Sequence, residues 1–229
     1  VERLSSLDKL RVVSATRWTE TISPPPPYTT DSLLYDASLR LKLTVEKAMR
    51  VAQELFESGL ITYHRTDSTR VSSAGIGVAR AYMEKRGLLD LFKPRSWGEG
   101  GAHEAIRPTR PLSLEDVDKA VAEGSLRIPI RLTWYHRALY DLVFRRFMAS
   151  QASEAEVVKA RIELEAGGKT ILVEGVGGYT RRGFTVFYEV HEVKPWMLEV
   201  TPGMELEVVE STVRKASKVS LYTTGDLVK

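Results

Sequence analysis

The chain is organised around residues 59–68, which read Gly59-Leu-Ile-Thr-Tyr63-His-Arg65-Thr-Asp-Ser68. Gly59 suits the left-handed backbone conformation that ends helices, so the sequence predicts a helix that stops here and a polar loop that follows. Side chains alternate between faces in an extended segment, so Tyr63 and Arg65 are expected to point the same way. One phosphate group could then meet both side chains.

The pair Tyr63 and Arg65 suits one kind of chemistry. A tyrosyl hydroxyl is a weak nucleophile because its reference pKa is about 10. It attacks phosphorus only if its proton is removed and the charge growing on the phosphoryl oxygens is neutralised. A planar guanidinium can neutralise that charge through two parallel hydrogen bonds. The alternative is that Tyr63, one of nine tyrosines, packs at the edge of a core with its hydroxyl in water.

Three ordered strings carry a resemblance to a known family. Residues 61–68 resemble the active-site motif of type IA DNA topoisomerases. Residues 101–109, Gly-Ala-His-Glu-Ala-Ile-Arg-Pro-Thr, resemble that family's second signature, and residues 26–33 resemble the entry to the domain that carries the tyrosine. Residues 97–101 and 144–151 are most similar to the reverse gyrase group of the family. The resemblance covers nearly the whole chain but only part of the family's protein.

The resemblance implies roles for individual residues. In the family, a tyrosine forms a 5′-phosphotyrosyl bond with one cut DNA strand, which is later rejoined, and Tyr63 occupies that position. Arg65 and His103 would be catalytic partners at the scissile phosphate. The residues expected to contact DNA are Arg70, Glu104, Arg107 and Thr109. The alternatives are that Glu104 orients His103 or caps the local backbone, and that Arg107 and Thr109 pack within the loop.

The resemblance also implies cofactors and partners that lie elsewhere. Type IA enzymes hold Mg²⁺ on an acidic cluster of a Toprim domain, and the acidic residues here are expected on helical surfaces or in capping positions. No metal site is therefore expected in this chain, and the Mg²⁺ ligands are expected outside it. There is also no GKT or GKS phosphate loop, so ATP is expected only in an absent helicase-like part. The expected partners are DNA, single-stranded at the cleavage site, and the remaining domains of the same polypeptide.

Composition sets looser bounds. The 229 residues include 33 Lys or Arg and 30 Asp or Glu, a net charge of +3, and no cysteine, which excludes disulfides and thiolate metal sites. Residues 28–153 hold 19 basic and 15 acidic residues, an excess of +4 on the segment expected to meet phosphates. No apolar run approaches the roughly 20 residues of a membrane span, and no signal peptide opens the chain. We expect a cytoplasmic protein, and the 28% charged content suits a thermophile.

Periodicity predicts an α+β fold. Strands are expected at 8–23, 157–165, 169–174, 184–190 and 205–213, and Gly167-Gly168 predicts a hairpin. Helices are expected from Thr30 or Asp31 to 41, after Thr44, after Ser72 or Ser73, from Ser113 to about 123 and after Thr133. Pro24 to Pro27 read as a stiff spacer.

Strands at both ends with helices between them predict a discontinuous β domain, residues 1–27 and 154–221. A helical domain, residues 28–153, would be inserted in it, and residues 222–229 would begin a following segment. The family resemblance implies that the β domain is part of an arch and that the helical domain is winged-helix-like.

Two functions are compatible with these observations. The first is a fragment of a type IA topoisomerase that cleaves and rejoins one DNA strand through Tyr63, inactive when isolated from the Toprim domain. The second is a winged-helix-like module that binds single-stranded DNA and catalyses nothing in isolation. The Tyr63 hydroxyl separates the two, because only the enzyme requires it.

Overall fold

The computed structural model describes residues 8–98 and 103–210. Part of the Gly-rich lead-in to His103 and the predicted segment 222–229 lie outside the described residues. The described chain divides into two compact units. One unit comprises residues 8–23, 154–183 and 189–210, and the other comprises residues 24–153 and 184–188.

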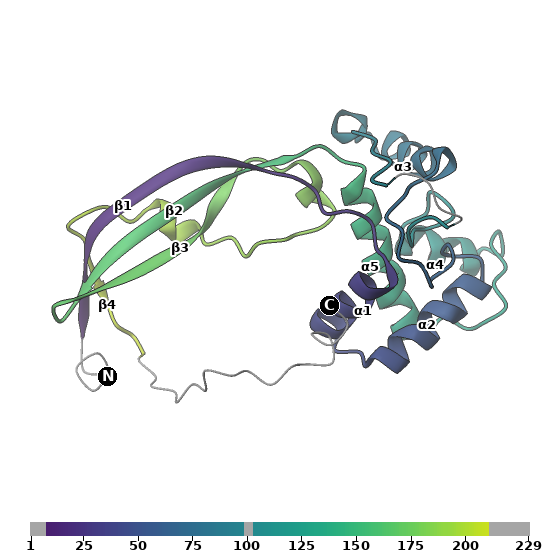
Figure 1. Cartoon of the computed structure of the whole chain (residues 1–229), viewed down its shortest axis with the longest axis horizontal. Helices are drawn as coiled ribbons and strands as arrows, with labels where there is room; N and C mark the ends of the chain where they lie inside the picture. The colour runs from purple at the N-terminus through teal and green to yellow at the C-terminus, as the bar shows by residue number, and fades with distance from the viewer. Residues whose placement is uncertain (1–7, 99–102, 211–229) are drawn as a thin grey trace. The chain divides into compact units, whose positions relative to one another are not determined.

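The first unit is a curled antiparallel sheet in the order β3-β2-β1-β4. Its strands are β1 (Lys9–Ile22), β2 (Ala155–Ala166), β3 (Lys169–Arg181) and β4 (Glu205–Glu207). Figure 1 shows β1, β2 and β3 as long, curved ribbons. The pairing of β1 with β2 runs from Arg11 opposite Glu165 to Ile22 opposite Ala155. The predicted pairing of the N-terminal strand with the C-terminal ones is therefore confirmed, as is the mixed α and β content.

Alternation in β2 explains this sheet. Val157, Ile162 and Leu164 are buried, and charged residues between them remain accessible, so one face packs against a core while the other meets water. That core joins Val12, Ala160, Ile162, Leu164, Met197 and Val200. Gly167 and Gly168 have φ angles of 56° and 79°, the backbone that a two-residue hairpin needs. The hairpin prediction is confirmed.

The strand predicted at 184–190 is wrong. Residues Gly183–Val186 form a short 3-10 helix, and residues 184–188 belong to the helical unit. Phe184, Phe187 and Tyr188 are buried at positions i, i+3 and i+4, a spacing that gathers side chains on one side of a helical turn. These three side chains pack into the core of the helical unit, and this packing overrides the alternation that predicted a strand. The strand predicted at 205–213 is also shorter within the described residues and ends at Glu207.

The second unit contains five α-helices. They are α1 (Thr30–Leu41), α2 (Val45–Glu57), α3 (Ser73–Lys85), α4 (Leu114–Ala122) and α5 (Trp134–Ser150). Side chains of Thr44 and Ser72 cap α2 and α3, and Ser113 with Asp116 forms a capping box at the predicted start of α4. The cap of α1 is Thr29 rather than Thr30 or Asp31, because the Thr30 hydroxyl is bonded elsewhere.

A buried carboxylate ties residues 184–188 to this unit. Asp36 of α1 accepts a hydrogen bond of 2.6 Å from the Tyr28 hydroxyl and a second from the Tyr188 hydroxyl. The Arg146 guanidinium lies over both rings, at 4.9 and 5.1 Å from their centroids. A buried carboxylate needs such partners, because an unpaired one is costly. The network holds the Tyr28 segment and the Phe184–Tyr188 segment against α1 and α5.

No helix within the described ranges has the length and apolarity needed to cross a membrane.

Candidate active site

Backbone hydrogen bonds bring the two main motifs together. The Thr62 amide donates to the Arg107 carbonyl at 2.9 Å, and the Arg107 amide donates to Thr62 Oγ1 at 3.0 Å. The Thr109 amide donates to the Leu60 carbonyl at 3.1 Å. Residues 60–62 and 107–109 therefore lie side by side, although more than forty positions separate them in the sequence.

The third motif joins the same assembly at the start of α1. The Thr30 amide donates to the Thr66 carbonyl at 2.8 Å, and Thr30 Oγ1 donates to the His64 carbonyl at 2.8 Å. The Thr66 amide donates in turn to Thr30 Oγ1. These bonds fix the backbone on either side of Arg65, so the tyrosine loop is anchored at both ends.

Tyr63 lies at the surface of this assembly, with 37% of its area exposed. Its ring contacts Phe56 of α2 edge-on at 5.3 Å and lies 5.3 Å from the His103 ring, centroid to centroid. Among the described residues, none forms a hydrogen bond with its hydroxyl. The phenol is therefore held by ring packing in a partly exposed position.

The structure brings His103 to Tyr63, as expected of two groups that serve one phosphate. Both are exposed, and they come from the two different motifs. Arg65 is also exposed, and its charge acts on the neighbouring His64. The expected common orientation of Arg65 and Tyr63 stays a prediction.

Glu104 and Arg107, expected to contact DNA, form an internal ion pair. The guanidinium donates to the two Glu104 carboxylate oxygens at 2.9 and 2.6 Å and is only 6% exposed. The Ser72 hydroxyl donates to Glu104 Oε2 at 2.8 Å, and the same Ser72 oxygen caps α3. Burial would raise the pKa of Glu104, but hydrogen bonds from Arg107 and Ser72 hold it below its ordinary value. The ion pair therefore stabilises the backbone that follows His103.

The other two residues expected at DNA are also tied to the scaffold. Thr109 Oγ1 donates to the Gly59 carbonyl at 2.6 Å. The Arg70 carbonyl accepts from the Ala105 amide at 2.8 Å, and its side chain is half-buried, with Nε enclosed and without a partner among the described residues. In this structure, the polar groups of Glu104, Arg107 and Thr109 form hydrogen bonds within the protein.

Comparison with known proteins identifies the family. Residues 1–229 match the family described as DNA topoisomerase, and a solved structure of topoisomerase I from Thermotoga maritima superposes with a TM-score of 0.67. This chain belongs to the type IA DNA topoisomerase family. The superposition has 26% sequence identity and covers 99% of this chain and 38% of the Thermotoga chain.

The predicted similarity to the reverse gyrase group is confirmed. The chain is 48% identical to reverse gyrase 2 of Aeropyrum pernix over 229 residues, all of this chain and 19% of that protein. It is 49% identical to the reverse gyrase of Pyrobaculum aerophilum over 86% of this chain and 16% of that protein. The chain thus spans less than a fifth of the length of each of these two relatives. The predicted thermophilic character fits both source organisms.

Sequence reasoning missed Gly75, which contributes to the site by lying against Arg107. An added Cβ at Gly75 would lie 2.6 Å from Arg107 Nε and 2.8 Å from Val71 Cγ1, both closer than atoms can approach. Gly75 thus leaves room for the Arg107 side chain across the first turn of α3. A glycine inside a predicted helix, where it costs about 1 kcal/mol relative to alanine, is the signal that could have found it.

Gly75→Ala is expected to lower the melting temperature, because the Arg107 side chain must leave its place against Gly75. We expect a loss of about 1–3 kcal/mol in unfolding free energy. Gly77→Ala is the matched control, since an added Cβ there meets nothing within 4 Å. It should stabilise by up to about 1 kcal/mol through helix propensity. Equal behaviour of the two variants would contradict the role of Gly75.

His64 is buried without hydrogen-bond partners. It is 1% exposed, and neither ring nitrogen has a partner among the described residues. Its ring packs against Tyr63 at 5.5 Å and Phe56 at 6.1 Å. Burial, followed by the charge of Arg65, lowers the pKa of His64 below its ordinary value of 6.5. Burial therefore favours the neutral form of the His64 ring.

The pKa of His64 predicts a dependence of stability on pH. Because the folded-state pKa is the lower one, the unfolded chain binds the proton first, and stability is lost as pH falls below 6.5 towards the folded-state value. His64→Leu should stay within about 1 kcal/mol of the parent at pH 7.5, since it removes unpaired buried nitrogens, and its melting temperature should fall less at pH 5.5. The exposed His191→Leu should retain the parent's response. Parallel pH profiles of parent and His64→Leu would contradict the prediction.

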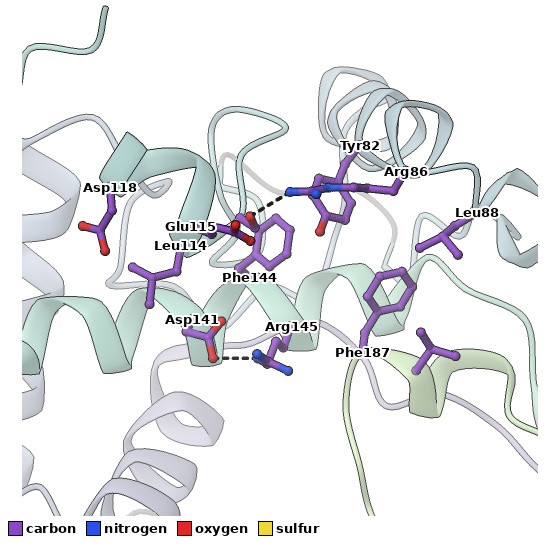
Figure 2. A pocket seen from close by; sticks show the side chains of 12 residues that line it. Tyr82, Arg86, Leu88, Leu114, Glu115, Asp118, Asp141, Phe144, Arg145 and Phe187 are labelled. Carbon is purple, nitrogen blue, oxygen red and sulfur yellow. Dashed lines mark hydrogen bonds and ion pairs between the residues drawn. The ribbon is translucent and has the colours of Figure 1, made fainter. Parts of the chain in front are cut away.

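A separate open pocket of about 780 Å³ lies in the helical unit. Figure 2 shows Tyr82, Phe144 and Phe187 in its wall, with Asp141 paired to Arg145 at the rim. The remaining lining residues are Arg86, Leu88, Ser113, Leu114, Glu115, Asp118 and Val186. No residue of the three motifs lines it, so the concave site of this unit and the tyrosine site are different places.

No group of three or more His, Asp or Glu side chains that could hold a metal ion occurs within the part of the chain that the structure describes. The carboxylate nearest in sequence to His103 is Glu104, and Arg107 and Ser72 already occupy its oxygens. The described residues therefore do not fit a Mg²⁺ site, and no chemical step is assigned to a metal in this chain.

Proposed function

We propose that this chain is the part of a reverse gyrase-like type IA topoisomerase that attacks DNA, cleaving and rejoining one strand through a 5′-phosphotyrosyl intermediate at Tyr63. The observation that carries the proposal is the pairing of an exposed Tyr63 with His103 at 5.3 Å, on two loops joined by hydrogen bonds. Membership of the family supports the same assignment.

The reaction follows from these side chains. The Tyr63 oxygen attacks the phosphorus of a backbone phosphodiester, the bond from Tyr63 to phosphorus forms, and the bond to the 3′ oxygen breaks. The tyrosine gives up its proton and the departing 3′ oxygen acquires one, so the two steps balance. Attack by the 3′ hydroxyl on the phosphotyrosine then restores both the strand and the enzyme. Arg65, and His103 when protonated, neutralise charge on the phosphoryl oxygens.

Glu104, Arg107 and Thr109 are assigned a positioning role. Their polar groups bond to one another, to Ser72 or to the Gly59 carbonyl, so they hold the His103 loop and the tyrosine loop in register. DNA contact by Arg70 remains part of the proposal, because its side chain is only half-buried.

The wider architecture is proposed from family membership. The discontinuous sheet unit, residues 8–23, 154–183 and 189–210, would form part of an arch, and the helical unit, residues 24–153 and 184–188, would be winged-helix-like. The Toprim and remaining topoisomerase domains of the full-length protein would face Tyr63 and supply the Mg²⁺ ligands. ATP would serve only a helicase-like part outside this chain.

A labelling experiment tests the proposal. The full-length protein is mixed with single-stranded DNA labelled at either end, in the presence of Mg²⁺, and the reaction is stopped with denaturant. A 5′-phosphotyrosyl bond retains the fragment that carries the 3′ end, so the 3′ label should stay with the protein and the 5′ label should be released. Mass spectrometry should place the adduct on the peptide that contains Tyr63. Retention of the 5′ label, or an adduct on another residue, would refute the proposal.

The isolated 229 residues should behave as the second candidate function describes. Because the chain spans only 19% of its Aeropyrum relative, we expect it to bind single-stranded DNA weakly and to form no adduct. An adduct formed by the isolated chain, and lost in Tyr63→Phe, would show that these residues hold a complete site.

A further inference from the structure

An exposed aromatic pair opens the last long helix. Trp134 and Tyr135 form the first positions of α5, and 61% and 39% of their areas are exposed. Their ring centroids lie 5.3 Å apart at an interplanar angle of 78°. Two large aromatic side chains left together at a surface usually mark an interaction site, and neither belongs to the motifs that identify the family.

The surroundings of this pair are basic. The Lys47 ammonium of α2 lies over the Tyr135 ring, 4.1 Å from its centroid. Residues 125–140 contain three arginines and no acidic residue. Of these arginines, Arg127 and Arg131 are exposed and form no ion pair with any described residue. The segment that carries the aromatic pair therefore has an excess of positive charge, although the chain as a whole is nearly balanced.

Hydrogen bonds of the neighbouring His136 hold the aromatic pair in place. The His136 imidazole contacts Thr133 Oγ1 at 2.7 Å through Nδ1 and Glu54 of α2 at 2.6 Å through Nε2. His136 is buried, so it fastens the first turn of α5 to α2. Trp134 and Tyr135 are thus presented on an anchored turn, which lowers the conformational entropy lost when a ligand binds them.

We propose that Lys47, Trp134 and Tyr135, with Arg131 three positions before the pair in the chain, form a second DNA contact that binds an unpaired segment of the strand. Bases stack on exposed aromatic faces without regard to sequence, and cations alongside hold the phosphates. Partly exposed aromatic rings with a lysine over one of them match that ligand better than an apolar protein surface does. The proposal rests on DNA being the substrate.

This surface is distinct from the tyrosine site. Lys47 lies near the start of α2, and Phe56, which packs against Tyr63, lies near its end. Nine positions of helix correspond to about 14 Å along the axis and to opposite sides of it, at 1.5 Å and 100° per residue. The surface would therefore hold DNA away from the cleavage point rather than at the reacting phosphate.

Binding measurements in a cleavage-deficient background test this surface. The full-length protein carrying Tyr63→Phe is titrated into a fluorescent single-stranded oligonucleotide, and the anisotropy gives Kd at several salt concentrations. Adding Trp134→Ala should weaken binding roughly 5- to 150-fold, the range expected for the loss of one stacked base. Trp134→Phe, which keeps an aromatic face, should stay within about threefold of the parent. Lys47→Ala should reduce the slope of log K against log salt by about 0.7.

The control is Trp196→Ala, which removes another exposed tryptophan, 43% accessible, from the other unit. It should leave Kd and the salt slope unchanged. The inference is overturned if Trp134→Ala binds as the parent does, as it would if another part of the full-length protein covers Trp134. It is also overturned if Trp134→Phe is as weak as Trp134→Ala, because stacking would then not be the cause.

The outcome is separable from that of the proposed function. With Tyr63 intact, Trp134→Ala should still form the covalent adduct at saturating DNA, with the loss appearing in the DNA concentration required. A parent protein that binds DNA but never forms an adduct would refute the role of Tyr63 and leave this surface standing. A Trp134→Ala adduct rate that stays low at saturating DNA would instead assign Trp134 to the chemistry and overturn the inference.

Discussion

Replacing Tyr63 by phenylalanine is expected to reduce the covalent protein–DNA adduct of the full-length protein to background. Phenylalanine keeps the ring contacts with Phe56 and His103, so the loop should remain folded. Only the oxygen that would bond to phosphorus is lost, and removal of a nucleophile costs about a millionfold in rate in well-studied enzymes. The measurement is the fraction of 3′-labelled DNA that remains with the denatured protein.

Tyr179→Phe provides the control for that result. Tyr179 lies in β3 of the other unit and belongs to neither proposed DNA contact. At saturating DNA it should form the adduct at the parent's rate. DNA binding by Tyr63→Phe should also match the parent, because the hydroxyl is proposed to react and not to hold the strand. A surviving adduct in Tyr63→Phe would mean that another residue is the nucleophile.

The second large effect is expected at Arg65. Arg65→Ala should slow adduct formation about 100- to 1000-fold in the full-length protein, the usual cost of removing one preorganised donor from a developing negative charge. The loss should appear in the rate at saturating DNA more than in Kd, because the interaction is strongest in the transition state. Single-turnover cleavage with excess protein separates these two quantities.

Two further variants sharpen the Arg65 result. Arg65→Lys should recover only part of the rate, since an ammonium keeps the charge but lacks the planar fork that binds two phosphate oxygens. Arg80→Ala removes an exposed arginine from α3 of the same unit and should leave the rate unchanged. If Arg65→Ala cleaves as fast as Arg80→Ala, Arg65 does not serve the scissile phosphate.

Local signals in the sequence predicted much of the helical unit. Thr44, Ser72 and Ser113 each cap the helix they were expected to cap, because a cap depends on a side chain and an amide only a few positions apart. Gly59 adopts the expected positive φ of 69° and delivers the tyrosine loop. The family resemblance also implied that His103 and Tyr63 would lie together, and their rings are 5.3 Å apart.

Burial was harder to predict. Alternation suggested a strand at 184–190, but the aromatic side chains of Phe184, Phe187 and Tyr188 pack into the helical unit. The family resemblance implied that Arg107 would contact DNA, but its guanidinium is bonded to Glu104. A motif shows which residues act together. It does not show whether an arginine binds a ligand or another residue of the protein, because either partner can neutralise its charge.

The sequence by itself therefore determined the family, the α+β class, the capped helices and the approach of His103 to Tyr63, since these depend on short-range patterns and ordered motifs. Only the tertiary structure decided that Gly75 makes room for Arg107, that no described residue forms a hydrogen bond with the buried His64 ring, and that Trp134 is left exposed. The reason is physical. Exposure and close approach depend on which distant side chains occupy the neighbouring space, and that is determined only when segments far apart in the chain pack together.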